Sequence, residues 1–284
     1  MENDILYKML NWQRDIQMMG KIYAEVTSKN INVFAAKQKV ASFVLPLEEN
    51  TTYNGKSGVL IANVRQTAIR IVDITCKPAQ GKWGLLLQRT RKMEPISQWD
   101  LVKSVFPIGD KMNENTHIFD GSVFTNKDGT MRYFMTALPM NVADEIAEAG
   151  VKLFGGPYRL KCLDTVENIL FHQYAKHGTE ALWVIFPQDD GLRVLFLTDG
   201  LPRAAWYVSN NPQFREDEVL RCLRASVQPV EVQDAGCAKE IKETALKRAA
   251  VLNTGWDLEW LCTLLAEQDV EVEQREYCLM DFIG

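Results

Sequence analysis

The string Asn54-Gly55-Lys56-Ser57-Gly58 holds the residues with the clearest chemical potential, because Gly-Lys-Ser matches the end of a phosphate-binding loop. A working loop also needs an earlier glycine, so that several backbone amides can wrap the phosphates. Asn50 stands at that position. The match is therefore partial, and it does not by itself predict a phosphate site.

Histidines and cysteines are the next candidates, as metal ligands. His172 and His177 are five residues apart on an expected helix, which separates them by ~140° around its axis. They cannot readily share one metal ion, and His117 lies far from both in sequence. The six cysteines contain no CxxC pair, a spacing typical of buried thiols in a reducing compartment. We expect no metal site.

Catalytic motifs are missing from the sequence. There is no GxSxG string, and no GxGxxG string follows an expected strand. The acidic groups Asp189-Asp190 and Glu216-Asp217-Glu218 lie in an expected turn and an early helical turn. Acids favour both places through turn geometry and the helix dipole. No nucleophile, base and oxyanion donor come together, so we expect no catalytic residues and no enzyme.

Composition narrows the class of protein. The chain has 284 residues, of which 46% are hydrophobic and 24% charged, so it is long and apolar enough for two folded domains. Its net charge of −5 argues against nucleic acid as the main partner. No window reaches the ~18 apolar residues of a membrane span, and the acidic start does not resemble a signal peptide. We expect a cytoplasmic protein without direct membrane insertion.

An amphipathic helix is predicted over residues 2–19. Five apolar side chains recur at steps of three or four and form one stripe: Ile5, Met9, Trp12, Ile16 and Met19. The stripe either packs on the protein's own core or is reserved for a partner or a second copy. Adsorption to a membrane is disfavoured, because acids offset the basic residues of the polar side.

Two three-stranded meanders are predicted from short apolar runs separated by turn residues. Their expected strands are 21–27, 31–36 and 40–46 in the first, and 182–187, 192–197 and 203–208 in the second. After the first we expect a helix over 59–74, from the spacing of its apolar residues, and a strand over 82–88. After the second we expect helix 212–225, strand 230–233, helix 237–246, strand 248–252, helix 256–267 and strand 269–274. The repeated architecture indicates two similar domains.

Between the meanders lies a separate unit. A helix over 97–105 is followed by a hairpin whose arms flank the turn Asn126–Gly129. Helices over 139–149 and 161–176 then lead to the second meander.

The order of these elements resembles the actin-like nucleotide-binding fold, in the form found in the type IV pilus assembly protein PilM and the cytoplasmic part of the type II secretion protein GspL. Residues 24–34 and 183–209 stand where that family has its two phosphate loops. Residues 119–153 resemble its inserted subdomain and the following helix, and residues 248–273 resemble its adenosine-contacting strand–turn–helix. The resemblance covers residues 21–275.

The resemblance implies a nucleotide site that this sequence has largely lost. Its expected residues are Glu25, Thr27, Ser28, Thr254 and Gly255. Thr27 replaces a family glycine. In the second loop Phe186 replaces the acid, Gln188 replaces a glycine and Pro187 removes an amide donor. We therefore expect no cofactor, with ATP and Mg²⁺ as the alternative.

Taken together, these observations predict an α/β, actin-like (ribonuclease H-like) two-domain fold with mixed sheets. The expected divisions are helix 1–20, a first domain 21–177 with an inserted α/β subdomain 97–137, and a second domain 178–284. The resemblance implies a non-catalytic adaptor of a pilus or secretion platform, peripheral to the inner membrane through the cytoplasmic tail of a membrane protein. Candidate partner-binding residues are the aromatics Trp99, Phe106, Phe119, Phe124 and Tyr133. The alternatives are an ATP-binding protein or ATPase of the same fold, and a self-assembling structural protein.

Overall fold

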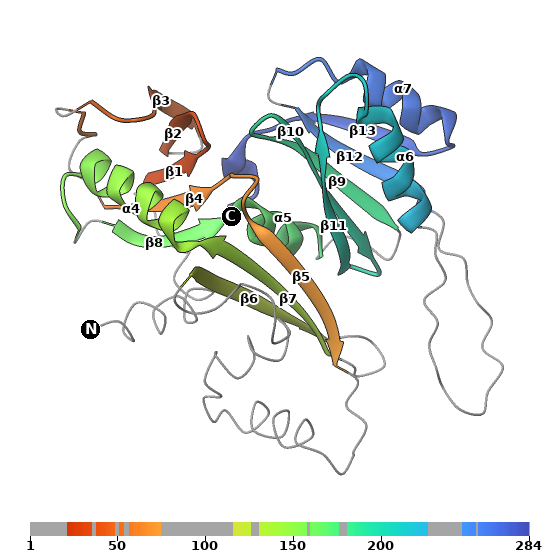
Figure 1. The fold of residues 1–284 in the computed structure, drawn as a ribbon, viewed down its shortest axis with the longest axis horizontal. Coiled ribbons are helices and arrows are strands. Elements are labelled where there is room, and N and C mark those ends of the chain that lie inside the picture. The colour runs from red at the N-terminus through yellow and green to blue at the C-terminus, as the bar shows by residue number, and fades with distance from the viewer. Residues whose placement is uncertain are drawn as a thin grey trace, which may run out of the picture. The chain divides into compact units, whose positions relative to one another are not determined.

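A computed structural model describes most of the chain in two compact units (Figure 1). The described residues are 22–35, 38–48, 51–53, 57–74, 116–125, 131–157, 160–175, 181–226, 246–253 and 255–283. Unit 1 spans Met1–Ile169 and Leu279–Gly284, and unit 2 spans Leu170–Cys278. This division falls inside a helix, between Ile169 and Leu170, whereas the boundary predicted from the sequence lies after residue 177.

The main sheet of unit 1 has five strands in the order β3-β2-β1-β4-β8. The strands β1 (Ile22–Val26), β2 (Asn30–Ala35) and β3 (Gln38–Val44) form an antiparallel meander. The strands β4 (Gly58–Ala62) and β8 (Leu160–Thr165) extend the sheet in parallel from β1. β1 therefore lies at the centre, with all five of its residues buried.

The sheet of unit 2 repeats this order as β11-β10-β9-β12-β13. The strands β9 (Leu182–Gln188), β10 (Gly191–Thr198) and β11 (Leu201–Ser209) form the antiparallel meander. The strands β12 (Arg248–Asn253) and β13 (Glu271–Glu276) continue in parallel from β9. Both predicted meanders are thus confirmed, and each continues into parallel strands.

A separate three-stranded antiparallel sheet, in the order β5-β7-β6, belongs to unit 1. The predicted hairpin is confirmed as β6 (His117–Thr125) and β7 (Met131–Pro139). The third strand, β5 (Ala68–Ile74), pairs with β7. This small sheet therefore draws on residues well before the expected start of the inserted unit at 97.

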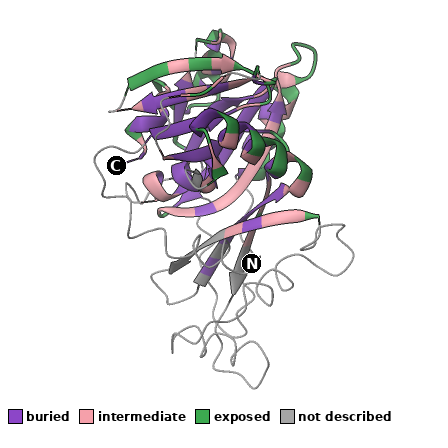
Figure 2. Ribbon diagram, turned by 90° about the vertical axis from the view of Figure 1, so that its left-hand side faces the viewer, coloured by how far each residue is buried: buried purple, intermediate pink, exposed green. Residues whose placement is uncertain are grey.

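Helices cover one face of each main sheet. In unit 1, α4 (Met140–Phe154) packs on β4 and β8, and its core with the main sheet includes Leu60, Ile146 and Leu153. In unit 2, α6 (Arg215–Ser226) and α7 (Glu259–Glu267) both contribute to one core with the inner strands. Figure 2 shows the buried residues concentrated in the inner strands, whereas exposed residues lie on the helices and on the edge strand β3.

Two expected helices were wrong, because their residues form strands. Residues 59–74 are not a helix but β4 and β5, joined by a turn in which the Thr67 amide donates to the Val64 carbonyl at 3.1 Å. The reason applies to β4: a parallel strand buried on both faces is apolar at nearly every position, so its sequence resembles that of a buried helix. Residues 160–165 are likewise β8, and the helix α5 begins only at Val166 (Val166–Tyr174).

Other expectations concern residues that the structure does not describe. They are helix 2–19, strand 82–88, helix 97–105, strand 230–233 and nearly all of helix 237–246. Among the described residues, no helix is long and apolar enough to span a lipid bilayer.

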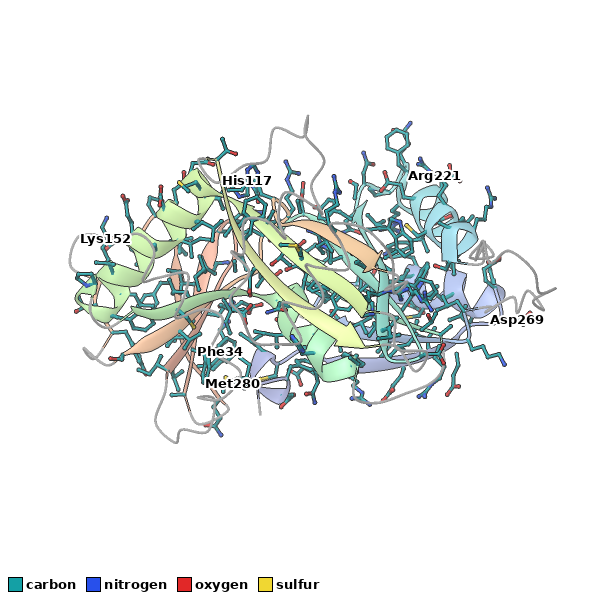
Figure 3. The ribbon with its side chains drawn as sticks, turned by 90° about the horizontal axis from the view of Figure 1, so that it is seen from below. Phe34, His117, Lys152, Arg221, Asp269 and Met280 are labelled. Atoms are coloured by element: carbon teal, nitrogen blue, oxygen red, sulfur yellow. The ribbon has the colours of Figure 1, made fainter. Side chains whose placement is uncertain are left out.

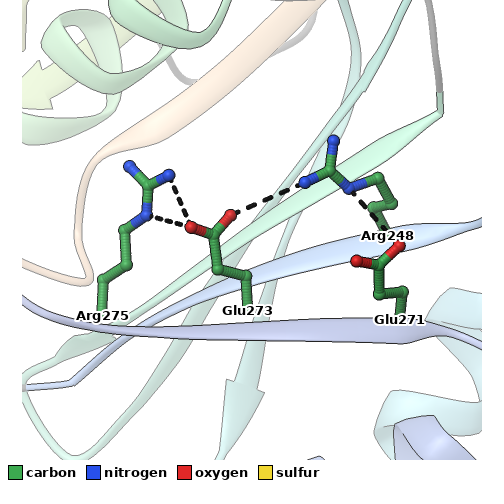
Figure 4. Close-up of polar contacts among 4 residues, drawn as sticks. All are labelled: Arg248, Glu271, Glu273 and Arg275. Carbon is green, nitrogen blue, oxygen red and sulfur yellow. Dashed lines mark hydrogen bonds and ion pairs between the residues drawn. The ribbon is translucent and has the colours of Figure 1, made fainter.

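Charged side chains line the edge strand β13 of unit 2 (Figure 4). Glu273 accepts from Arg275 at 2.6 Å and pairs with Arg248 of β12 at 3.7 Å, and Arg248 also lies 3.9 Å from Glu271. These side chains are between 41% and 74% exposed, so each pair adds little stability. Their main effect is to disfavour pairing of this open sheet edge with a strand of another molecule.

Packing explains Gly58, the last residue of the partial phosphate-loop string. It opens β4, and a Cβ atom there would overlap the ring of Phe154, which is fully buried on α4. The glycine allows a helix and a strand to approach closely, so it has a structural role without any ligand.

We expect Gly58→Ala to lower the free energy of unfolding by about 1–3 kcal/mol, because a methyl group is forced into a filled core. Combining it with Phe154→Leu, which makes room at the same point, should cost less than the sum of the two single changes. Urea denaturation of all three variants measures this coupling, with Ser57→Ala as the neighbouring control. Simple additivity would contradict the proposed contact.

Candidate functional site

Polar residues collect where the parallel strands of unit 1 end. The carboxyl ends of β1, β4 and β8 lie at one edge of the sheet because the three strands run parallel. Glu25 pairs in register with Ile61, and Ile61 with Asp164, so the two acids occupy one row across three strands. Residues in one row of a sheet share a face. Glu25 and Asp164 therefore point to the same side, away from α4.

Glu25 is buried and held by a neighbour. Its exposed fraction is 4%, and its Oε1 accepts a hydrogen bond of 2.8 Å from Asn63 Nδ2, just after β4. The backbone N–H of Asn63 donates to the Val26 carbonyl at 2.8 Å, and this bond extends the pairing of β1 and β4 by one residue. Glu25, the acid among the residues of the expected nucleotide site, is therefore held in a fixed position.

The β1–β2 turn, expected to be the first phosphate loop, is closed by Thr27. Its Oγ1 accepts from the amides of Asn30 at 3.0 Å and Lys29 at 3.3 Å. The Thr27 amide itself donates to the Asn30 carbonyl at 2.9 Å. Amides that would wrap a phosphate are thus used inside the turn. Ser28, the other residue expected here, lies exposed at its tip.

A second acidic group, not anticipated from the sequence, surrounds Asp164. Its Oδ1 accepts from the Thr165 amide at 2.7 Å and from Asn168 Nδ2 at 3.0 Å. The same Asn168 amide group lies 3.1 Å from Asp120 Oδ2, on β6. Asn168 thus joins the main sheet to the three-stranded sheet within unit 1. Asp164 Oδ2 is buried without a hydrogen bond.

Burial raises the pKa of Asp164 to about 7, and the negative charge of Asp120 adds to the rise. Glu167, fully buried in the first turn of α5, contributes in the same direction. The hydrogen bonds from Asn168 and Thr165 oppose the rise only in part. Asp164 is therefore a buried acid that exchanges its proton near neutral pH.

This acidic group is not arranged as a metal centre. Within the described part of the chain, no three His, Cys, Asp or Glu side chains are placed to hold a metal ion.

In unit 2 the turn between β9 and β10, expected to be the second phosphate loop, is filled by its own side chains. Arg193 Nε donates to Gln188 Oε1 at 2.7 Å, and both residues are buried. The guanidinium also lies over the ring of Tyr207, at 5.7 Å from its centre. Tyr207 Oη donates to Asp190 Oδ1 at 2.5 Å. Asp189 and Asp190 add negative charge at this turn.

The turn after β12 is held by Asn253. Its Oδ1 accepts from the Trp256 amide at 2.8 Å, and its Nδ2 donates to the Trp256 carbonyl at 2.9 Å. Gly255 lies within this loop with φ of 87°, a left-handed conformation suited to glycine. Thr254 lies outside the described residues. Thus Glu25, Thr27 and Ser28 meet at one edge in unit 1, and Gly255 lies at a strand end in unit 2.

The expected partner-binding aromatics divide into three groups. Phe119 is only 2% exposed and belongs to the core of unit 1. Phe124 lies on β6, where it pairs with Arg132 of β7. Tyr133 lies on β7, where it pairs with Val123 of β6. Trp99 and Phe106 lie outside the described residues.

We expect stability to fall as pH rises because of Asp164. Its folded pKa of about 7 exceeds the ~3.9 of an unfolded chain, so unfolding releases a proton between these values. The free energy of unfolding therefore falls from about pH 4 to about pH 7 and stays low above. Asp164→Asn removes the charge, and it should raise stability at pH 8 by on the order of 1–3 kcal/mol with little effect near pH 4.

Thermal denaturation between pH 4 and 8 measures this difference. The control is Asp144→Asn, on the exposed side of α4. An unchanged pH profile in Asp164→Asn would remove the buried acid as the cause.

The comparisons with known proteins give the fold and not the function. No protein-family model matches the chain, and no curated protein matches it in sequence. A chain of the "PilM-PilN type IV pilus biogenesis complex" is similar in structure, with a TM-score of 0.55 at 12% identity, over 90% of this chain and 88% of that one. A Bacteroides thetaiotaomicron protein with an actin-like ATPase fold and unknown function aligns with a TM-score of 0.50 at 9% identity, over 93% of this chain and 94% of that one. The chain has an actin-like fold, and it resembles PilM.

Proposed function

We propose that this protein is a non-catalytic adaptor of a pilus or secretion assembly platform. The observation that carries the proposal is the closure of both expected phosphate-loop turns by the protein's own groups. Thr27 uses the amides of the first turn, and the contacts from Gln188 to Tyr207 fill the second. A nucleotide would have to break these hydrogen bonds and approach two carboxylates.

The likeness to a chain of the PilM–PilN complex supports the kind of partner. In this proposal the partner is the cytoplasmic segment of an inner-membrane protein. The adaptor lies in the cytoplasm and reaches the membrane through that contact. The strands β5 and β6 are the two edges of the small sheet, and an extended peptide can add to such an edge.

The second candidate is an ATP-binding protein of the same fold. Glu25 and Asp164 favour it, because they place two acids on one side of the sheet at the ends of parallel strands. The left-handed turn at Gly255 is a further feature that a nucleotide site would use. A direct binding measurement separates the two candidates.

We expect Mg-ATP at ~1 mM to leave the melting temperature unchanged, since a ligand stabilises a protein only by binding the folded state. Thermal denaturation with and without Mg-ATP tests this, with Mg²⁺ alone as the control. A micromolar dissociation constant in calorimetry would favour the second candidate instead.

The partner is tested by affinity capture from solubilised membranes of the native host, followed by cross-linking and mass spectrometry. Deleting residues 97–137 would remove buried Phe119 and Phe134 with most of the small sheet, so substitutions are preferable. We expect Trp99→Ala/Phe106→Ala to reduce capture of a membrane protein about tenfold, the effect of losing ~1.4 kcal/mol of binding free energy.

The matched control is Asn141→Ala, at an exposed position on α4. The cross-links should fall in the partner's cytoplasmic segment. Equal capture by the variant and the wild type would exclude Trp99 and Phe106 as the contact. Capture of no membrane protein by any form would contradict the adaptor function.

A further inference from the structure

The two main sheets share one strand order but differ in the connection that precedes their fourth strand. In unit 2 the chain passes from β11 to β12 through α6, and from β12 to β13 through α7. In unit 1 the connection from β4 to β8 contains α4, the counterpart of α7. The connection from β3 to β4 corresponds to the connection from β11 to β12, which contains α6 in unit 2. Its described residues, 45–48, 51–53 and 57, include no helix.

This difference changes what covers the sheet. In unit 2, Val219, Cys222 and Leu223 of α6 join the same core as Leu261 and Leu265 of α7, so two helices cover one face. In unit 1, α4 is the one helix among the described residues that contributes to the corresponding core.

Where no described helix covers this face of unit 1, the connection itself closes part of it. Leu47 is buried in the core, and the Tyr53 amide donates to the Leu153 carbonyl at the end of α4, at 2.7 Å. The side chains of Ala41 and Phe43 on β3 also face this core, but they remain partly exposed. The face is therefore less completely covered at β3 than at β1.

A groove of about 410 Å³ remains beside α4. Its apolar lining comes from four places. They are the end of β1 (Val26), the connection after β3 (Leu45, Pro46 and Leu47), the turn after β4 (Val64) and α4 (Val142, Ile146 and Ala149). Glu145, Glu148 and Lys152 supply charge along its α4 side, and Figure 3 labels Lys152 near the end of that helix. An apolar floor with a charged border suits an amphipathic helix.

The chain carries such a segment next to the groove in sequence. Residues 2–19 have one apolar stripe, through Ile5, Met9, Trp12, Ile16 and Met19, and they end just before β1. As a helix the segment would be ~27 Å long, which exceeds the ~17 Å of β1. It can therefore extend along the whole sheet and reach the groove beyond the end of β1. Gly20 and Lys21 would form the link, and glycine commonly follows a helix end.

The direction of the chain is also compatible. α6 starts beside the carboxyl end of β9, where the Asn210 amide donates to the Asp190 carbonyl at 3.3 Å, and it runs back over the sheet. A helix that ends at residue 19 must finish at the opposite edge, where β1 begins. It would therefore run antiparallel to β1, the orientation that α6 has relative to β9.

We infer that residues 2–19 form a helix that packs in this groove of unit 1, in the position that α6 occupies in unit 2. The stripe covers the apolar lining beside α4, and the polar side faces water. The two units then have matching helical layers, one made from a connection and the other from the N-terminal segment. This inference does not depend on the proposed function.

Hydrogen–deuterium exchange of the full-length protein tests the inference. In the wild type we expect the amides of 2–19 to exchange at least about tenfold more slowly than in an unstructured peptide. Val142→Glu places a charge in the groove, and Trp12→Glu/Ile16→Glu places two in the stripe. Each should abolish the protection of residues 2–19 while leaving strands β9–β11 protected.

Two controls are matched to these variants. Asn141→Lys changes an exposed residue that does not line the groove. Arg14→Glu changes a residue on the side of the expected helix opposite the stripe. Both should retain protection of 2–19. If Val142→Glu also unfolds β9–β11, the stripe variant carries the test, since it changes no residue of the described core.

Three results would overturn the inference. The first is free-peptide exchange of residues 2–19 in the wild type. The second is protection that survives both groove and stripe variants. The third is protection that rises with protein concentration, because the groove would then hold the segment of a second copy.

Discussion

The central position of β1 and β9 is the constraint on which the other elements depend. Each strand is bonded to an antiparallel neighbour on one side and a parallel neighbour on the other. The antiparallel side needs only short turns. The parallel side needs a crossover that returns the chain to the same starting edge, and α4, α6 and α7 provide it for β8, β12 and β13. The strand order therefore dictates both where α4, α6 and α7 lie and where the strand ends gather.

Those strand ends are the place where this fold concentrates polar groups, and here most of these groups bond to one another. Thr27 bonds to the amides of its own turn, Asn63 holds Glu25, and Asn253 closes the loop before α7. Each bond is made without a ligand, so the folded state leaves these donors satisfied. Asp164 differs, because one of its oxygens is buried without a hydrogen bond. The stability of unit 1 is therefore sensitive to the charge of this residue.

The sequence predicted the elements whose signals are local. Both meanders and the β6–β7 hairpin were visible from turn residues such as Asp199-Gly200 and from short apolar runs. β4 was missed because it lies between the parallel strands β1 and β8, and a strand buried in this way has no alternation to mark it. β8 was missed because the expected helix over 161–176 included its residues. The Asp120–Asn168 contact joins residues 48 positions apart, and only the fold brings them together. Buried acids of this kind leave no pattern in one sequence beyond a carboxylate near the end of an apolar run.

The return of the last residues to unit 1 has a consequence for synthesis on the ribosome. Residues 279–284 belong to unit 1, and Leu279, Met280 and Ile283 are buried. All residues of unit 2 leave the ribosome before them, although most of unit 1 is made first. Every residue of unit 2 is therefore made before unit 1 receives these three apolar side chains. A chain that stops before residue 279 would hold every residue of unit 2 but would lack three buried side chains of unit 1.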